Sequence, residues 1–109
     1  MRRPHVLSKN TQMAAELLGL EVARARRERR WSQAELAERA GIARSTLHNL
    51  ESGDPTVSVG IAFEVATLLG VPLFTPEQDR LSDLVARQRD RLALLPTKVR
   101  PRASIDNAF

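Results

Sequence analysis

Apolar residues are spaced along residues 11–95 in the way that is typical of amphipathic α-helices. In a first segment, from Thr11 to about Arg30, they recur three and four positions apart, which places them on one face of a helix. This stripe consists of Met13, Ala14, Leu17, Leu18, Val22 and Ala25. Residues 1–10 show no such pattern, and we expect a flexible N-terminal arm there.

Two short helices follow, separated by a single glycine. Ser32 and Glu35 have the spacing of a capping box, which begins a helix, and Gly41 supplies the left-handed turn that ends it. A second short helix covers residues 44–52, and Gly53 stops it. Their inward residues are Leu36, Ala37 and Ala40 in the first helix and Leu47 and Leu50 in the second.

Two longer helices complete the pattern. Ser58 caps a fourth helix, which Gly70 closes. Thr75 as cap, with Pro76 at the first helical position, predicts a fifth helix that ends before Pro96. The inward residues are Ile61, Ala62, Val65, Ala66 and Leu69 in the fourth helix and Leu81, Leu84, Val85 and Leu92 in the fifth.

The predicted fold is therefore all-α, with one domain of five helices over residues 11–95. No strand pattern and no internal repeat appear in that range. Residues 96–109 are different, because Pro101 and the basic residues among residues 97–102 favour an extended chain. We expect a short extended C-terminal tail there.

The composition adds a basic charge and the absence of cysteine. The chain has 17 Lys and Arg against 13 Asp and Glu, a net charge of +4, and a pI of about 10.9. Such an excess points weakly to nucleic acid as a partner. Without cysteine there is no disulfide framework and no Cys-based zinc site. The absence of cysteine also fits a reducing, cytoplasmic setting, and we expect a cytoplasmic protein. No apolar run reaches the length of a membrane span, so we expect no membrane binding.

No arrangement of residues indicates catalysis. Ser45, His48 and Asp54 have the side chains of a hydrolase triad, but they lie too close together along a short helix to adopt its geometry. His48 has only His5 as a second histidine, which gives no metal site. We therefore expect no enzymatic activity, no cofactor and no metal.

The two short helices around Gly41 have the arrangement of a helix-turn-helix, in which the second helix enters the major groove of DNA. Arg44 suits guanine O6 and N7, and Asn49 suits adenine N6 and N7. At the start of the preceding helix, Ser32 and Gln33 lie where a phosphate can be bound. The polar outward residues of the second helix are Arg44, Ser45, His48 and Asn49.

Residues 32–53, which read SQAELAERAGIARSTLHNLESG, resemble the Cro/phage-repressor (XRE) family of helix-turn-helix proteins. The family pattern is SQ-x-x-LA, a turn glycine, a short recognition helix and E-x-G. It is matched by Ser32, Gln33, Leu36, Ala37, Gly41, Glu51 and Gly53. The resemblance extends over residues 18–71 and includes the preceding segment LGLEVARARRERR. It implies a lambda-repressor-like fold and a repressor that binds a specific sequence in double-stranded DNA.

The resemblance also implies a role for single residues. The base-reading positions are Arg44, Ser45 and Asn49. The positions beside the DNA backbone are Ser32, Gln33, Thr46 and His48. Arg26 and Glu51 match a pair that ties the first helix to the recognition helix. Ala43 departs from the family, which often has Ser or Thr there, and the lost cap costs about 1 kcal/mol. Trp31 replaces the usual aliphatic residue and should alter core packing.

Five arginines lie between residues 24 and 30. Such a run is compatible with a phosphate-binding stripe, but a solvated helix face is the commoner use of exposed charge, and Glu28 dilutes the positive charge. We interpret Arg24 and Arg27 as solvated. We interpret Arg26 as structural through Glu51.

We expect a homodimer, because one short recognition helix contacts too few base pairs to discriminate well. Two such helices would bind half-sites of a palindromic operator about 34 Å apart. The fifth helix, through Leu84, Val85 and Leu92, is the candidate dimer interface. Residues 96–109 are the second choice.

The flanking segments resemble a narrower group. Residues 51–60, ESGDPTVSVG, and residues 99–109, VRPRASIDNAF, are similar to HipB-like antitoxins, which pair with HipA-family kinase toxins. This resemblance implies the antitoxin of a toxin-antitoxin operon, which represses that operon and binds the kinase. The alternative is a stand-alone XRE-family transcriptional repressor. A basic tail that ends in Phe109 favours the antitoxin, since simple repression does not need it.

Overall fold

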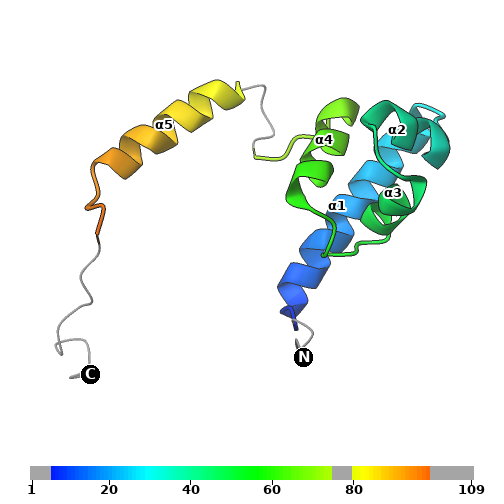
Figure 1. The fold of residues 1–109 in the computed structure, drawn as a ribbon, viewed down its shortest axis with the longest axis horizontal. Helices are drawn as coiled ribbons and strands as arrows, with labels where there is room; N and C mark the ends of the chain where they lie inside the picture. Colours follow the sequence, from blue (N-terminus) through cyan, green and yellow to red (C-terminus); the bar gives the residue numbers. More distant parts are fainter. Residues whose placement is uncertain (1–5, 75–79, 99–109) are drawn as a thin grey trace. The chain divides into compact units, whose positions relative to one another are not determined.

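The computed structural model describes residues 6–74 and 80–98, and it contains five α-helices (Figure 1). The helices are α1 (Lys9–Glu28), α2 (Gln33–Ala40), α3 (Arg44–Glu51), α4 (Val59–Leu69) and α5 (Leu81–Ala93). No strand occurs within these two ranges. The prediction of an all-α fold with five helices is confirmed. Helices α1–α4 form one compact unit and α5 belongs to a second, so each is described by itself. One domain over residues 11–95 stays a prediction.

The first unit is built on a small apolar core. Helix α1 packs against α3 and α4, and α2 packs against the same two helices (Figure 1). Val22, Leu36, Leu47 and Val65 have no solvent exposure, and each contributes roughly 1.5–3 kcal/mol through burial. The buried apolar residues are Val22, Ala25, Leu36, Ala37, Leu47, Leu50, Ala62, Val65, Ala66, Leu69 and Val71. The inward faces predicted for α2, α3 and α4 are therefore confirmed, with Ala40 and Ile61 only partly buried.

The N-terminal part of α1 differs from the sequence prediction in two ways. The helix begins at Lys9 instead of Thr11, because the Ser8 hydroxyl accepts a hydrogen bond from the Thr11 N–H at 3.2 Å and caps it earlier. Met13 and Leu17 were expected on the buried face, but they are 55% and 58% exposed. The first turns of α1 extend beyond α3 and α4, so no other described helix of the first unit covers them (Figure 1).

Three helices end at a glycine in the left-handed region, as predicted. Gly41, Gly53 and Gly70 have φ values of 70°, 84° and 71°. In each case the next residue returns a backbone N–H to a carbonyl in the last helical turn, for example Val71 to Ala66 at 2.9 Å. This hydrogen bond satisfies one of the carbonyl groups that a helix end leaves without a partner.

Helix α1 ends in the same left-handed turn, but the residue in the left-handed conformation is an arginine. Arg30 has φ 60°, and its N–H donates to the Arg27 carbonyl at 2.9 Å, while Trp31 N–H donates to the Arg26 carbonyl at 3.2 Å. A side chain in this conformation costs roughly 1–2 kcal/mol, and glycine would avoid that cost. The sequence contains no glycine here, so the end of α1 was placed near Arg30 instead of at Glu28.

Gly19 lies where α1 crosses α3. A Cβ atom at this position would lie 2.5 Å from the Leu50 carbonyl oxygen and 2.6 Å from that of Glu51, which is far inside van der Waals contact. Only a residue without a side chain allows the two backbones to approach so closely. The sequence analysis missed this residue, although a glycine in the middle of a helical pattern is a signal for close packing.

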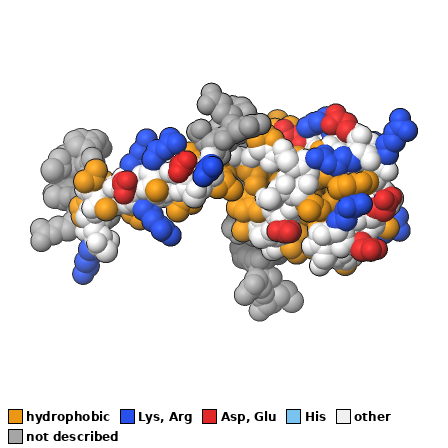
Figure 2. Space-filling view, turned by 90° about the horizontal axis from the view of Figure 1, so that it is seen from above, with side chains coloured by type: hydrophobic (Ala, Val, Ile, Leu, Met, Phe, Trp, Pro, Cys, Tyr) orange, Lys and Arg blue, Asp and Glu red, His pale blue; other side chains and the backbone are white. Residues whose placement is uncertain are grey.

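Helix α5 begins at Leu81, and none of its residues is buried. Leu81, Val85 and Leu92 are exposed and Leu84 is half-buried, and apolar side chains are visible between the charged ones of this helix in Figure 2. The start predicted at Thr75 lies outside the described residues, as does most of the C-terminal tail. Within the described ranges no helix is long and apolar enough to cross a membrane.

The first prediction concerns the helix crossing. Gly19→Ala should destabilise the protein by about 1–3 kcal/mol, because the methyl group forces α1 away from the α3 carbonyls. Gly60→Ala is the control, since a Cβ at Gly60 meets nothing within 4 Å. It should be neutral or stabilising by at most about 1 kcal/mol. Urea denaturation of both variants measures the difference, and equal stabilities would contradict the proposed close contact.

Candidate nucleic-acid interface

Helix α3 has one buried face and one exposed polar face. Leu47 and Leu50 are buried in the core and fix the helix on the first unit. Thr46 is half-buried between the two faces. The exposed polar residues are Arg44, Ser45, His48 and Asn49, which are the four that the sequence placed outward. Ala43 precedes the helix without any side-chain cap, as expected from its methyl group.

The start of α2 contains the predicted capping box. The Ser32 hydroxyl accepts from the Glu35 N–H at 3.1 Å, and the Ser32 N–H donates to Glu35 Oε1 at 3.2 Å. These bonds fix the first turn of α2 and with it the position of Gln33. They also occupy the Ser32 N–H with a carboxylate, so the hydroxyl hydrogen is the donor of Ser32 that the capping box leaves over.

Arg26 and Glu51 form a nearly buried ion pair between α1 and the end of α3. Arg26 Nε donates to Glu51 Oε2 at 2.7 Å and Nη2 donates to Oε1 at 2.9 Å, with the two side chains 9% and 7% exposed. The third donor, Nη1, is bonded to the Trp31 carbonyl at 2.8 Å. One guanidinium group therefore connects three parts of the unit, which are α1, the turn that precedes α2, and the end of α3. The pair implied by the family resemblance is present in this geometry.

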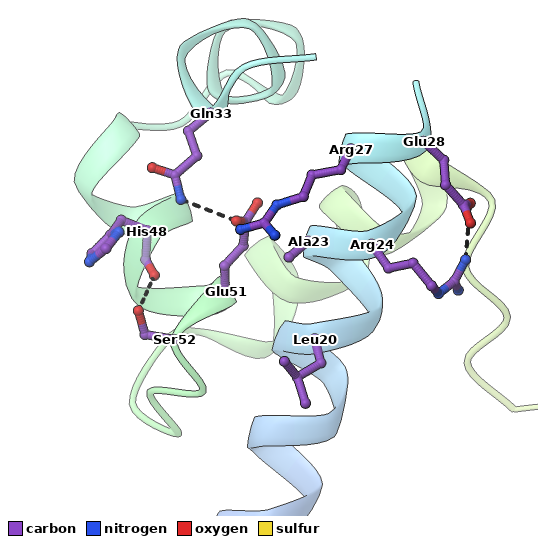
Figure 3. Close-up of a pocket in the computed structure, with 9 residues that line it drawn as sticks. All are labelled: Leu20, Ala23, Arg24, Arg27, Glu28, Gln33, His48, Glu51 and Ser52. Atoms are coloured by element: carbon purple, nitrogen blue, oxygen red, sulfur yellow. Dashed lines mark hydrogen bonds and ion pairs between the residues drawn. The ribbon is translucent and has the colours of Figure 1, made fainter. Parts of the chain in front are cut away.

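Gln33 is also part of this network. Its Nε2 donates to Glu51 Oε1 at 3.1 Å (Figure 3). The sequence places Gln33 beside the DNA backbone, where it was also expected to brace the first residue of the recognition helix, and Glu51 was not identified as its partner. The spacing of 18 residues between Gln33 and Glu51 carries no periodic signal, so only the folded structure brings them together.

The charges of the pair stabilise one another. Burial raises the pKa of Glu51, but the hydrogen bonds from Arg26 and Gln33 and the positive charges of Arg26 and Arg27 bring that pKa below its ordinary value. The hydrogen bond to Glu51 raises the pKa of Arg26, although burial opposes this change. Both side chains are therefore charged at neutral pH.

An open hollow lies between α1, the start of α2 and α3 (Figure 3). It is lined by Leu20, Ala23, Arg24, Arg27, Glu28, Gln33, His48, Glu51 and Ser52. Two of the predicted backbone residues, Gln33 and His48, therefore open on the same space. The Ser52 hydroxyl donates to the His48 carbonyl at 2.8 Å and closes the end of α3. The hollow adjoins the exposed face of α3, on the side toward α1.

The arginine run divides into separate roles. Arg29 Nη2 donates to the Leu69 carbonyl at 2.7 Å, which ties α1 to the end of α4. The Cζ atoms of Arg29 and Arg39 also lie 5.6 Å and 4.3 Å from the centre of the Trp31 ring, so the tryptophan interacts with two cations. Arg24 forms an exposed ion pair with Glu28 at 3.0 Å. Arg29 is thus a structural residue that the sequence analysis did not identify.

The comparison with protein families agrees with this geometry. Residues 22–75 match the family model HTH_3, which is described as a helix-turn-helix. This part of the chain is similar to helix-turn-helix domains. The matched range includes α2, α3 and α4 and the part of α1 that holds Arg26, and it indicates a DNA-binding transcription regulator. Comparisons with curated proteins and with solved structures give no significant match.

A second prediction tests the central ion pair of this helix-turn-helix. Glu51→Ala should lower the free energy of unfolding by about 3–5 kcal/mol, because it leaves the Arg26 guanidinium buried without its partner. Glu28→Ala removes the exposed pair with Arg24 and should cost no more than about 0.5 kcal/mol. Denaturant unfolding of the two variants gives the comparison, and similar losses would contradict a special role for the buried pair.

The same pair predicts a pH dependence. Because the folded pKa of Glu51 is below the ordinary 4.5, the stabilisation is complete above that value and is lost as the pH falls through the folded pKa. The protein should therefore lose stability on acidification, and Glu51→Gln should show a flatter loss. Melting temperatures of the parent chain and of Glu51→Gln, measured from about pH 3 to about pH 7, span the titration of a glutamate and test this difference.

Proposed function

We propose that the protein is a sequence-specific repressor of transcription that inserts α3 into the major groove of double-stranded DNA. The observation that carries this proposal is the exposed polar face of α3, whose opposite face is anchored by Leu47 and Leu50 and whose end is held by Glu51. A polar helix face whose side chains form no hydrogen bond or ion pair with the described residues is available for base edges. The helix-turn-helix match over residues 22–75 supports the same proposal.

The side chains divide into two groups in this proposal. Arg44, Ser45 and Asn49 contact base edges, and Ser32, Gln33, Thr46 and His48 contact the DNA backbone. The hydrogen bond from Gln33 to Glu51 supports a positioning role, because it orders the Gln33 side chain before DNA binds. An ordered side chain avoids an entropy cost of about 0.5–1.5 kcal/mol on binding.

We also propose that the protein binds a palindromic operator as a homodimer. A single α3 covers too little DNA for discrimination, and two copies would meet half-sites about 34 Å apart. Helix α5 is the proposed interface through Leu84, Val85 and Leu92, with residues 96–109 as the second choice. In support, a helix of 13 residues with no buried side chain is marginal in water unless a partner covers its apolar side.

The narrower proposal is that the protein is the antitoxin of a HipA-type kinase toxin and represses its own operon. Its support is the resemblance of residues 51–60 and 99–109 to HipB-like antitoxins. The alternative is a stand-alone XRE-family repressor. A kinase encoded by the neighbouring gene, captured by the full chain and lost on deletion of residues 97–109, would decide for the antitoxin. Its absence would leave the stand-alone repressor.

A third prediction tests the reading face. Arg44→Ala should weaken specific DNA binding by roughly 1–3 kcal/mol and relax the sequence preference at one position, because a bidentate contact to a base is removed. Asn49→Ala should relax the preference at a different position. In vitro selection with each variant measures both effects. Parent-like affinity and preference in both variants would show that this face does not read bases.

A fourth prediction tests the dimer. Light scattering at micromolar concentration should give twice the mass of one chain, and Val85→Arg should shift it toward the monomer by placing a charge in the interface. Ser82→Arg adds the same charge on α5 at a position without an apolar side chain and is the control. A monomeric parent chain, with or without DNA, would contradict the proposal.

A further inference from the structure

Arg27 was interpreted from the sequence as a solvated residue. Arg27 lines the hollow between α1 and α3, and its guanidinium group extends toward Gln33 and Glu51 (Figure 3). The lining residues of α1 lie at positions 20, 23, 24, 27 and 28, which is one face of the helix beside the buried one. Arg27 is therefore directed to the space that adjoins α3.

The other charges around the hollow are already paired. Arg24 is bonded to Glu28 at 3.0 Å, and Arg26 takes both oxygens of Glu51. Within the described ranges Arg27 makes no ion pair. Its positive charge acts on Glu51, and that carboxylate already accepts hydrogen bonds from two other residues. The hollow thus holds one positive charge that no carboxylate among the described residues neutralises through direct contact.

We propose that Arg27 is a further DNA-backbone residue, which binds a phosphate in the hollow together with Gln33 and His48. A guanidinium group offers planar paired donors that match two phosphate oxygens. This inference rests on the proposed function: with the exposed face of α3 in the major groove, the DNA backbone would pass the side of α3 that faces α1. The phosphate would lie between two helices. Gln33 of α2, which is held by Glu51, is on one side, and Arg27 of α1 is on the other.

A different role for Arg27 would be to stabilise Glu51 by its charge alone. The two roles predict different results, because a purely internal role affects folding and leaves DNA binding unchanged. A backbone contact instead releases counterions from DNA, so its loss changes the dependence of binding on salt concentration. It carries no base information, so the preferred DNA sequence should not change.

The experiment measures the binding constant of the full chain over a range of potassium chloride concentrations. The probes are one duplex selected in vitro with the parent chain and one duplex of arbitrary sequence. Arg27→Ala should reduce the slope of log Kobs against log salt by about 0.9 for each bound copy of the chain, with both duplexes. Arg27→Lys retains a positive charge and should keep most of the slope.

Arg24→Ala is the matched control, since Arg24 lies on the same helix and lines the same hollow but is paired with Glu28. It should leave the slope close to that of the parent chain. Melting temperatures of Arg24→Ala and Arg27→Ala should lie close to that of the parent, because both residues are exposed and each loses only a weak surface interaction.

Three outcomes overturn the inference. Parent-like slopes for Arg27→Ala, with DNA binding intact, would overturn the role of Arg27 and leave the proposed function standing. Equal reductions for Arg24→Ala and Arg27→Ala would indicate a general effect of charge and would also overturn it. A parent chain that binds neither duplex at low salt would overturn the proposed function together with this inference.

Discussion

The ion pair between Arg26 and Glu51 is the interaction on which the arrangement of the first unit depends. It joins α1 to α3 over 25 residues of sequence, with two hydrogen bonds at 2.7 Å and 2.9 Å and little solvent exposure. Glu51 also accepts from Gln33, and Arg26 also donates to the Trp31 carbonyl. A charge buried to this degree is stable only when its partners are present, so the network favours a single relative placement of α1, α2 and α3.

The pair is possible only because α1 and α3 are very close. Gly19 lies against the carbonyl oxygens of Leu50 and Glu51, at a distance that no side chain would tolerate. This contact brings the end of α3 within reach of Arg26, which lies two helical turns further along α1. A backbone constraint at one point therefore determines the geometry of the proposed DNA-binding surface at another.

The same crossing separates arginines that look alike in the sequence. Arg26 binds a carboxylate in the interior of the unit, Arg29 binds backbone carbonyls from an exposed position, and Arg24 pairs with Glu28 on the surface. Arg27 extends into the hollow beside Gln33. Because a helix turns by 3.6 residues, neighbours in a basic run face different surroundings, and their roles follow from what α2, α3 and α4 place there.

The sequence by itself determined the local structure of the first unit. Helix starts at Ser32 and Ser58 and helix ends at Gly41 and Gly70 were predicted correctly, because caps and left-handed turns depend on one or two residues. The inward faces of α2, α3 and α4 were predicted for the same reason, since helical periodicity is a local property. The motif from Ser32 to Gly53 was enough to identify the helix-turn-helix.

The tertiary structure decided what depends on contacts between distant residues. The exposure of Met13 and Leu17 depends on which part and which face of α1 the neighbouring helices cover, which no local pattern contains. The left-handed turn at Arg30 lacks the glycine that would have indicated it, and neighbouring contacts hold it instead. The bond from Gln33 to Glu51 and the position of Arg27 in the hollow arise from the packing of three helices. Side chains on different helices meet only once the chain has folded, and for that reason the sequence could not place them.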